Sequence, residues 1–128
     1  MKALLDTCAF LWMITDSADL SPKARDIVAD PENDLYLSAA SCWEIAIKAG
    51  LGRIRFKGNP EQIIPEEMQK LSIRPVSVLH SHALRTANLK PHHRDPFDRI
   101  LIAQSEIERL PILTPDALFR PYGVRLIW

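Results

Sequence analysis

Short apolar segments alternate along the chain with segments of helical spacing, and this alternation constrains the fold more than any other feature. The strand-like segments are 2–6, 35–38, 73–78, 111–114 and 124–127. The helical segments between them are 7–16, 20–31, 41–52, 60–71 (interrupted by Pro65), 81–89 and the run that begins at Pro96. Strands joined through helices form a mostly parallel sheet with helices on both faces. We therefore expect an α/β/α sandwich.

The composition indicates one folded domain over residues 1–128, which we expect in the cytoplasm. The chain is 47% hydrophobic and 25% charged, with a formal net charge of zero. A zero net charge is not typical of proteins that bind nucleic acid through bulk positive charge. Such binding would have to rest on local patches or on a metal ion. No apolar run is long enough to cross a membrane.

The cysteines and histidines form no recognisable metal pattern. Cys8 and Cys42 are expected to be small buried thiols. The spacings of the four histidines match no standard zinc site, namely His80, His82, His92 and His93.

Four carboxylates fall where predicted strands end or predicted helices begin. Asp6 follows the first strand, Glu44 lies in the first turn of the helix after 35–38, and Asp116 comes two residues after 111–114. The ends of parallel strands and the starts of the following helices share one edge of a sheet, so these three should converge. Asp98 begins a helix that precedes a strand. It joins them only if the region 73–90 first crosses back to the same edge.

Carboxylates gathered at one edge repel each other, and a divalent cation relieves that repulsion. Oxygen ligands favour Mg²⁺ or Mn²⁺, which can activate water to attack a phosphodiester. Structural roles are also open at this point. Asp6 can cap a helix, Glu44 can pair with Lys48 four residues later, and Asp116 can stabilise a turn after Pro115.

The segment "HHRDPFDRILIAQS" (92–105) contains two acids with different expected roles. Asp95 before Pro96 is a standard helix start, with an acceptor at the N-cap and proline at the first helical position. Asp98 is not needed as a cap. It is therefore the better candidate for a metal ligand.

Four segments together resemble a known family. They are "LLDTCAFLW", "LSAASCWEIAIKAGLGRI", "HHRDPFDRILIAQS" and "LTPDALF". In this order they resemble the motifs of PIN-domain ribonucleases, and more closely those of the VapC-type toxins of bacterial toxin–antitoxin pairs. The resemblance extends from Leu4 to Ile127. It implies a Rossmann-like α/β/α sandwich around a parallel sheet.

The resemblance also implies a site and a reaction. The acidic metal site would be formed by Asp6, Glu44, Asp98 and Asp116. Supporting positions would be Thr7, Ser38 and Thr114, while Asp95 belongs to the signature of one subgroup. The implied reaction is endonucleolytic cleavage of RNA. Water activated by Mg²⁺ or Mn²⁺ attacks phosphorus and leaves a 5′-phosphate and a 3′-hydroxyl, and no histidine base is required.

Candidate contacts to RNA are basic residues near these motifs: Lys48, Arg53, Arg55, Lys57, His93, Arg94 and Arg99. If 53–57 is extended, its three cations point to one side and can contact phosphates. We expect Trp12 and Trp43 to pack in the core or at an interface. The resemblance implies a homodimer and a VapB-like antitoxin as partner, with a tail that can bring a basic side chain to the acidic site.

Two other functions remain open from the sequence. A PIN-fold nuclease can serve RNA processing without being a toxin. A non-catalytic module can use an acidic pocket only to bind a partner. Metal-dependent cleavage distinguishes the second from a nuclease, and a neighbouring gene for an antitoxin distinguishes the first from a toxin.

Overall fold

A five-stranded sheet organises the chain, as the alternation predicts. The computed structural model describes residues 1–128. The strands are β1 (Lys2–Leu5), β2 (Asp34–Ser38), β3 (Arg74–Val76), β4 (Ile112–Leu113) and β5 (Leu126–Ile127). All neighbouring strands are parallel, in the order β3-β2-β1-β4-β5. None of the helices has the length and apolar character needed to cross a membrane.

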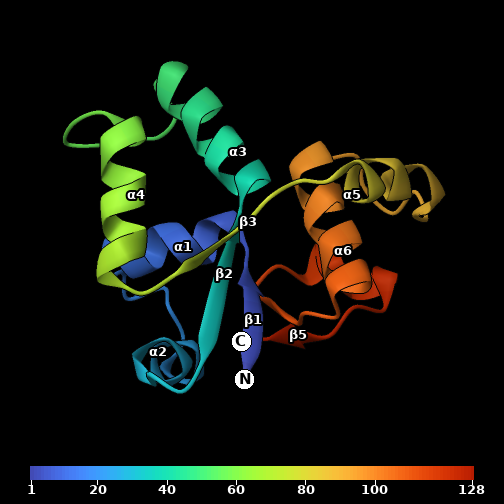
Figure 1. The fold of residues 1–128 in the computed structure, drawn as a ribbon, viewed down its shortest axis with the longest axis horizontal. Coiled ribbons are helices and arrows are strands. Elements are labelled where there is room, and N and C mark those ends of the chain that lie inside the picture. Colours follow the sequence, from blue (N-terminus) through green and yellow to red (C-terminus); the bar gives the residue numbers. More distant parts are fainter.

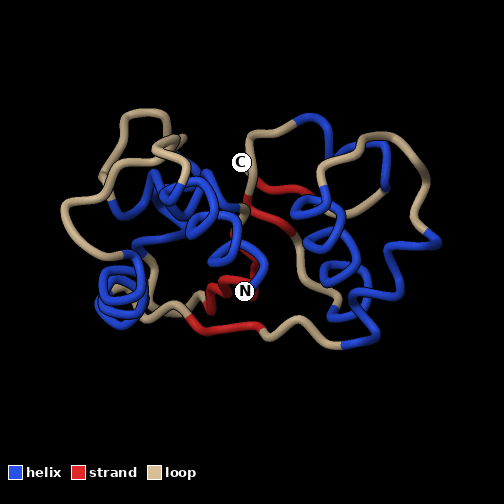
Figure 2. Tube along the Cα trace, turned by 90° about the horizontal axis from the view of Figure 1, so that it is seen from above, coloured by secondary structure: helices blue, strands red, loops and turns tan.

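Helices cover both faces of this sheet. On one side lie α1 (Thr7–Ile14), α2 (Pro22–Ala29), α3 (Ala39–Gly50) and α4 (Pro60–Lys70). On the other lie α5 (His80–Arg85) and α6 (Pro96–Glu108), together with the 3₁₀ helices η1 (Thr86–Asn88) and η2 (Ala117–Tyr122). Figure 1 shows these two groups on either side of the central strands, and Figure 2 shows the same division from above.

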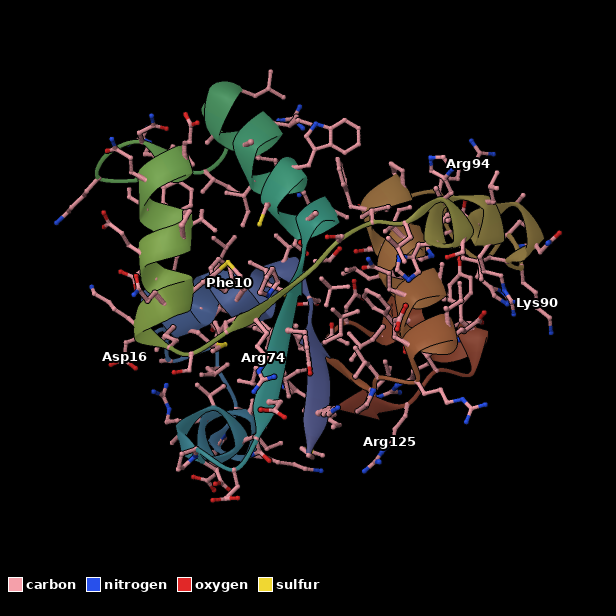
Figure 3. All side chains as sticks on the ribbon, in the orientation of Figure 1. Phe10, Asp16, Arg74, Lys90, Arg94 and Arg125 are labelled. Carbon is pink, nitrogen blue, oxygen red and sulfur yellow. The ribbon has the colours of Figure 1, made fainter.

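The core has two halves because successive strand residues point to opposite faces. Leu5 of β1 packs with Phe10 of α1 in the larger half, and Leu4 packs with Leu101 of α6 in the smaller half. Phe10 is fully buried and lies within the part formed by α1 to α4 (Figure 3). Both faces of β1 are therefore buried, which suits its nearly continuous apolar sequence.

Helix starts follow the expected chemistry at two places. The Ser21 side chain caps α2 and Pro22 occupies its first position. Asp95 caps α6 ahead of Pro96, as predicted. For α1, the cap is Asp6, a structural role that the sequence left open for it, and Thr7 is the first helical residue. Asp6 can do this because its carboxylate accepts from the Ala9 backbone N–H.

Two helical segments differ from the prediction. Helix α3 begins at Ala39, two residues before the expected segment 41–52, because Ser38 ends β2 and also caps the helix through the Ala40 N–H. Glu44 is therefore not in the first turn. Helix α4 continues through Pro65 instead of being interrupted there. The structure thus tolerates one missing backbone N–H inside this helix.

Strand β3 decides on which edge Asp98 lies. It forms the edge of the sheet, parallel to β2, so the segment 73–78 carries the chain back to the carboxyl-terminal edge. The chain passes from there through α5 and η1 into α6. Helix α6 consequently begins at the edge where β1, β2 and β4 end, and Asp98 is brought to the same edge as the other acids.

Candidate active site

Asp6 lies at the centre of this edge, directly after β1, and its side chain is held from two sides. Oδ1 accepts a hydrogen bond from the Ala9 N–H at 2.7 Å, and Oδ2 accepts one from the Thr114 hydroxyl. Asp6 is only 5% exposed. Burial raises the pKa of Asp6, and the Asp116 charge adds to that rise, while its hydrogen bonds act in the opposite direction.

Glu44 reaches the same edge from the second turn of α3. Its Oε1 accepts a hydrogen bond from the Thr7 hydroxyl at 2.6 Å, and that hydroxyl lies 3.0 Å from the Ser41 Oγ. Its Oε2 forms an ion pair with Lys48 at 2.5 Å. The hydrogen bond to Glu44 is the main reason that the pKa of Lys48 is raised. The ion pair with Lys48, one of the two roles left open by the sequence, is therefore present, and the role of Glu44 as a metal ligand stays a prediction.

Asp116 and Thr114 follow β4. The Asp116 side chain caps η2 by accepting from the Leu118 N–H at 2.9 Å. Thr114 is buried and joins two of the acids, since its hydroxyl donates to Asp6 and accepts from the Asp116 N–H at 3.0 Å. This threonine fixes the end of β4 against the end of β1.

Asp95 and Asp98 lie at the start of α6. Asp95 Oδ1 accepts from the N–H groups of Phe97 at 2.9 Å and Asp98 at 3.2 Å. Burial raises the pKa of Asp98 to about 7. The charges of the neighbouring acids raise it further: Asp95, Glu44, Asp116 and Asp6. The four predicted ligands are therefore close enough for the other three charges to act on Asp98.

The donor set fits a hard divalent cation in its chemistry. Lys48 is the cation paired directly with one of the four acids, so negative charge is in excess. Asp98 Oδ1 and Asp116 Oδ2 accept no hydrogen bond from the protein. No three His, Cys, Asp or Glu side chains lie close enough together to hold a metal ion as they stand. The other six carboxylate oxygens of these acids face protein donors.

Four of the predicted RNA contacts have exposed side chains. Arg53, Arg55 and Lys57 are exposed on the loop between α3 and α4, and the intervening Ile54 and Phe56 pack against the core. Arg94 is also exposed and lies on the outer surface of its loop (Figure 3).

Arg99 has a different position from that expected of an RNA contact. Its two Nη atoms donate to backbone carbonyl oxygens and to the Tyr122 hydroxyl. Both Nη atoms of Arg99 therefore form hydrogen bonds within the protein.

Several side chains contact the acids in ways that the sequence did not predict. The Cys8 thiol lies 3.3 Å from Asp6 Oδ1, and burial together with the Asp6 charge raises its pKa. His93 Nε2 lies 3.4 Å from Asp98 Oδ2, and its Nδ1 lies 2.7 Å from the Tyr122 hydroxyl. Tyr122 is 29 residues from His93 and lies outside the quoted motifs, so only the fold reveals this contact. Of the two positions expected for Trp43, the core is wrong, because its side chain is 65% exposed with its ring against Phe97, and an interface stays a prediction.

Comparison with known proteins defines the class. The model of the family described as "PIN domain" matches residues 3–124, and the chain belongs to this family. Ribonuclease VapC16 of Mycobacterium tuberculosis is 40% identical to the chain over 76 residues, which is 59% of the chain. These residues cover 54% of that protein, so the match spans about half the length of this curated relative.

Solved structures share the fold. The crystal structure of VapBC2 from Rickettsia felis, bound to a DNA fragment from its promoter, superposes with a TM-score of 0.73 and 13% identity. That match covers 99% of this chain and 98% of the other. A toxin–antitoxin complex from Klebsiella pneumoniae gives a TM-score of 0.64 and 17% identity, covering 98% and 96%. At these identities the likeness concerns the fold.

Proposed function

We propose that this protein is a metal-dependent endoribonuclease and acts as the toxin of a toxin–antitoxin pair. The observation that carries the proposal is the convergence of four carboxylates from four separate elements at one edge of the sheet. Burial raises the pKa of Asp98, and the charges of the neighbouring acids raise it further. A bound divalent cation relieves repulsion of this kind. The PIN family match and the 40% identity to a named ribonuclease support RNA as substrate.

In this proposal Asp6, Glu44, Asp98 and Asp116 hold Mg²⁺ or Mn²⁺. When bound, the cation would supply an activated water for attack on phosphorus and would stabilise the charge that develops on the phosphate oxygens. Thr7 and Thr114 orient Glu44 and Asp6 through the hydrogen bonds described above. Ser38 and Asp95 hold the starts of α3 and α6, and therefore the positions from which two of the acids project.

Substrate and partner contacts complete the proposal. Arg53, Arg55, Lys57 and Arg94 are exposed and can contact RNA phosphates. We also propose a VapB-like antitoxin and a second copy of the chain as protein partners. The relatives named above include a toxin–antitoxin complex, which supports the first of these.

The test is cleavage of total RNA by the purified protein with Mg²⁺, with Mn²⁺ or with EDTA, beside an Asp6→Asn variant purified in the same way. Asparagine keeps a capping oxygen for the Ala9 N–H, so the fold should survive. We expect discrete fragments that require the metal and disappear in the variant. Metal binding without cleavage of any RNA would instead favour a binding module.

Asp95 provides a prediction that separates capping from metal binding. Asp95→Asn should retain most of the activity and stability, because asparagine also accepts the hydrogen bonds of a helix N-cap. Asp95→Ala should lower the free energy of unfolding by about 1 kcal/mol. Urea denaturation and RNA cleavage measure the two effects. If Asp95→Asn loses as much activity as Asp6→Asn, Asp95 is itself part of the metal site.

A further inference from the structure

We propose that His93, held in place by Tyr122, is a positioning residue that fixes the carboxylate of Asp98 for the cation. This inference rests on the proposed function, in which Asp98 is a metal ligand. His93 lies on the loop before α6, and Tyr122 ends η2. The two side chains join the loop, η2 and the start of α6 around one acid.

The hydrogen bonds around the Tyr122 hydroxyl determine which nitrogen of His93 carries a proton. The phenolic oxygen receives the backbone N–H of His93 at 3.2 Å and an N–H of Arg99 Nη1 at 3.2 Å. A phenol has one proton and two acceptor positions. Both acceptor positions are filled, so the hydroxyl proton is directed to His93 Nδ1, at 2.7 Å.

The tautomer of His93 follows from this arrangement. A neutral imidazole that accepts at Nδ1 carries its proton on Nε2. This Nε2–H faces Asp98 Oδ2 at 3.4 Å and donates to it. In this state the ring has no free lone pair for a proton from water or RNA. His93 therefore acts on Asp98 and not as a general base, which agrees with a mechanism that requires no histidine base.

The surroundings hold the imidazole in this orientation. Its side chain is only 11% exposed, and its ring packs against the rings of Phe119 and Tyr122. Arg99 fixes the loop by donating to the carbonyl oxygens of Thr86, Leu89, Lys90 and His93. Arg99, which the sequence suggested as an RNA contact, therefore stabilises the loop that carries His93.

The hydrogen bond from His93 fixes the direction of the Asp98 carboxylate. With Oδ2 facing His93, Oδ1 is left without a protein donor and is available to the cation. Hydrogen bonds to metal-binding side chains commonly contribute about 10-fold to 100-fold in metal affinity. We expect the His93 bond to contribute within this range, with Tyr122 acting one step further away.

The test combines Mn²⁺ binding with the nitrogen NMR spectrum of the histidines. His93→Leu should weaken Mn²⁺ binding by about 10-fold to 100-fold. His93→Gln should restore most of it, because the glutamine amide can place an N–H near the former Nε2. His92→Leu is the matched control, since the neighbouring His92 side chain makes no hydrogen bond to an acid, although its ring also packs against Tyr122. Thermal unfolding checks that each variant folds.

In the metal-free wild-type protein, His93 should show the spectrum of a ring protonated at Nε2 only. Tyr122→Phe should shift His93 toward a mixture of tautomers and weaken Mn²⁺ binding less than His93→Leu. A wild-type ring protonated at Nδ1 alone, with no proton on Nε2 to donate to Asp98, would overturn the inference. Equal Mn²⁺ affinity in wild type and His93→Leu would overturn the inference alone. If wild type binds no Mn²⁺, the proposed function fails and this inference fails with it.

Discussion

Replacing Asp98 by asparagine is expected to lower RNA cleavage by about 10³-fold while making the metal-free protein more stable at neutral pH. The loss follows because Asp98 is proposed to bind the cation, and a metal ligand supplies several kcal/mol of transition-state stabilisation, at about 1.4 kcal/mol for each factor of ten. The gain in stability follows because the substitution removes a buried charge that is repelled by four other acids. Cleavage rates and urea denaturation at pH 7.5 measure the two effects.

Lower activity together with higher stability is the diagnostic result, because a damaged fold would lower both. The matched control is Asp95→Asn, which removes a carboxylate from the same helix start but should keep most of the activity. If Asp98→Asn retained activity close to wild type, Asp98 would not be a ligand, and the assignment of the metal site would have to change.

The stability of the metal-free protein is expected to fall as the pH rises from about 4 to 7. Asp98 has an ordinary pKa of 3.8 and a pKa of about 7 in the folded protein. Between these values the native state binds more protons than the unfolded state, so the free energy of unfolding decreases with pH. The displacement corresponds to at most about 4 kcal/mol, and solvent reduces this because the side chain is 20% exposed.

The difference between wild type and Asp98→Asn isolates this effect from other titrating groups. Denaturation curves of both proteins at several pH values, in EDTA, should diverge through this range, with the variant the more stable at pH 7. Mn²⁺ should then stabilise wild type above pH 7 more than the variant. Parallel pH profiles for the two proteins would mean that burial and the neighbouring acids do not raise the pKa of Asp98 in the folded protein.

Local chemistry made much of the fold predictable. The parallel sheet follows from the alternation of strand and helix segments. The strand predicted within 73–78 is confirmed despite Pro75, which an edge strand tolerates. Ser21 and Asp95 cap helices as their positions indicate. In each case the residues that determine the structure are neighbours in sequence.

Features that depend on distant contacts were less predictable. Ser38 can end a strand or cap a helix, and only its place in the sheet reveals that it does both. The exposure of Trp43 is decided by which side of α3 meets α6, which residue spacing does not define. The same limit hid the roles of Arg99 and Tyr122, whose partners lie on separate elements.

The candidate site contains acids whose position follows from the local sequence and one whose position depends on distant contacts. Asp6 and Asp116 could be placed at one edge because each follows a strand directly. The position of Asp98 required knowledge that β3 returns the chain to this edge. The ligand roles, inferred from this convergence and from the family resemblance, stay predictions.

The most direct test of the metal site is the chemistry of the ends of the cleaved RNA, determined for products formed by wild type with Mn²⁺ and for matched reactions with Asp98→Asn. Attack by an activated water should leave 5′-phosphate and 3′-hydroxyl ends, and the variant should produce almost none of these products. Cyclic 2′,3′-phosphate ends, or equal product from the variant, would show that the cleavage does not arise from the four carboxylates.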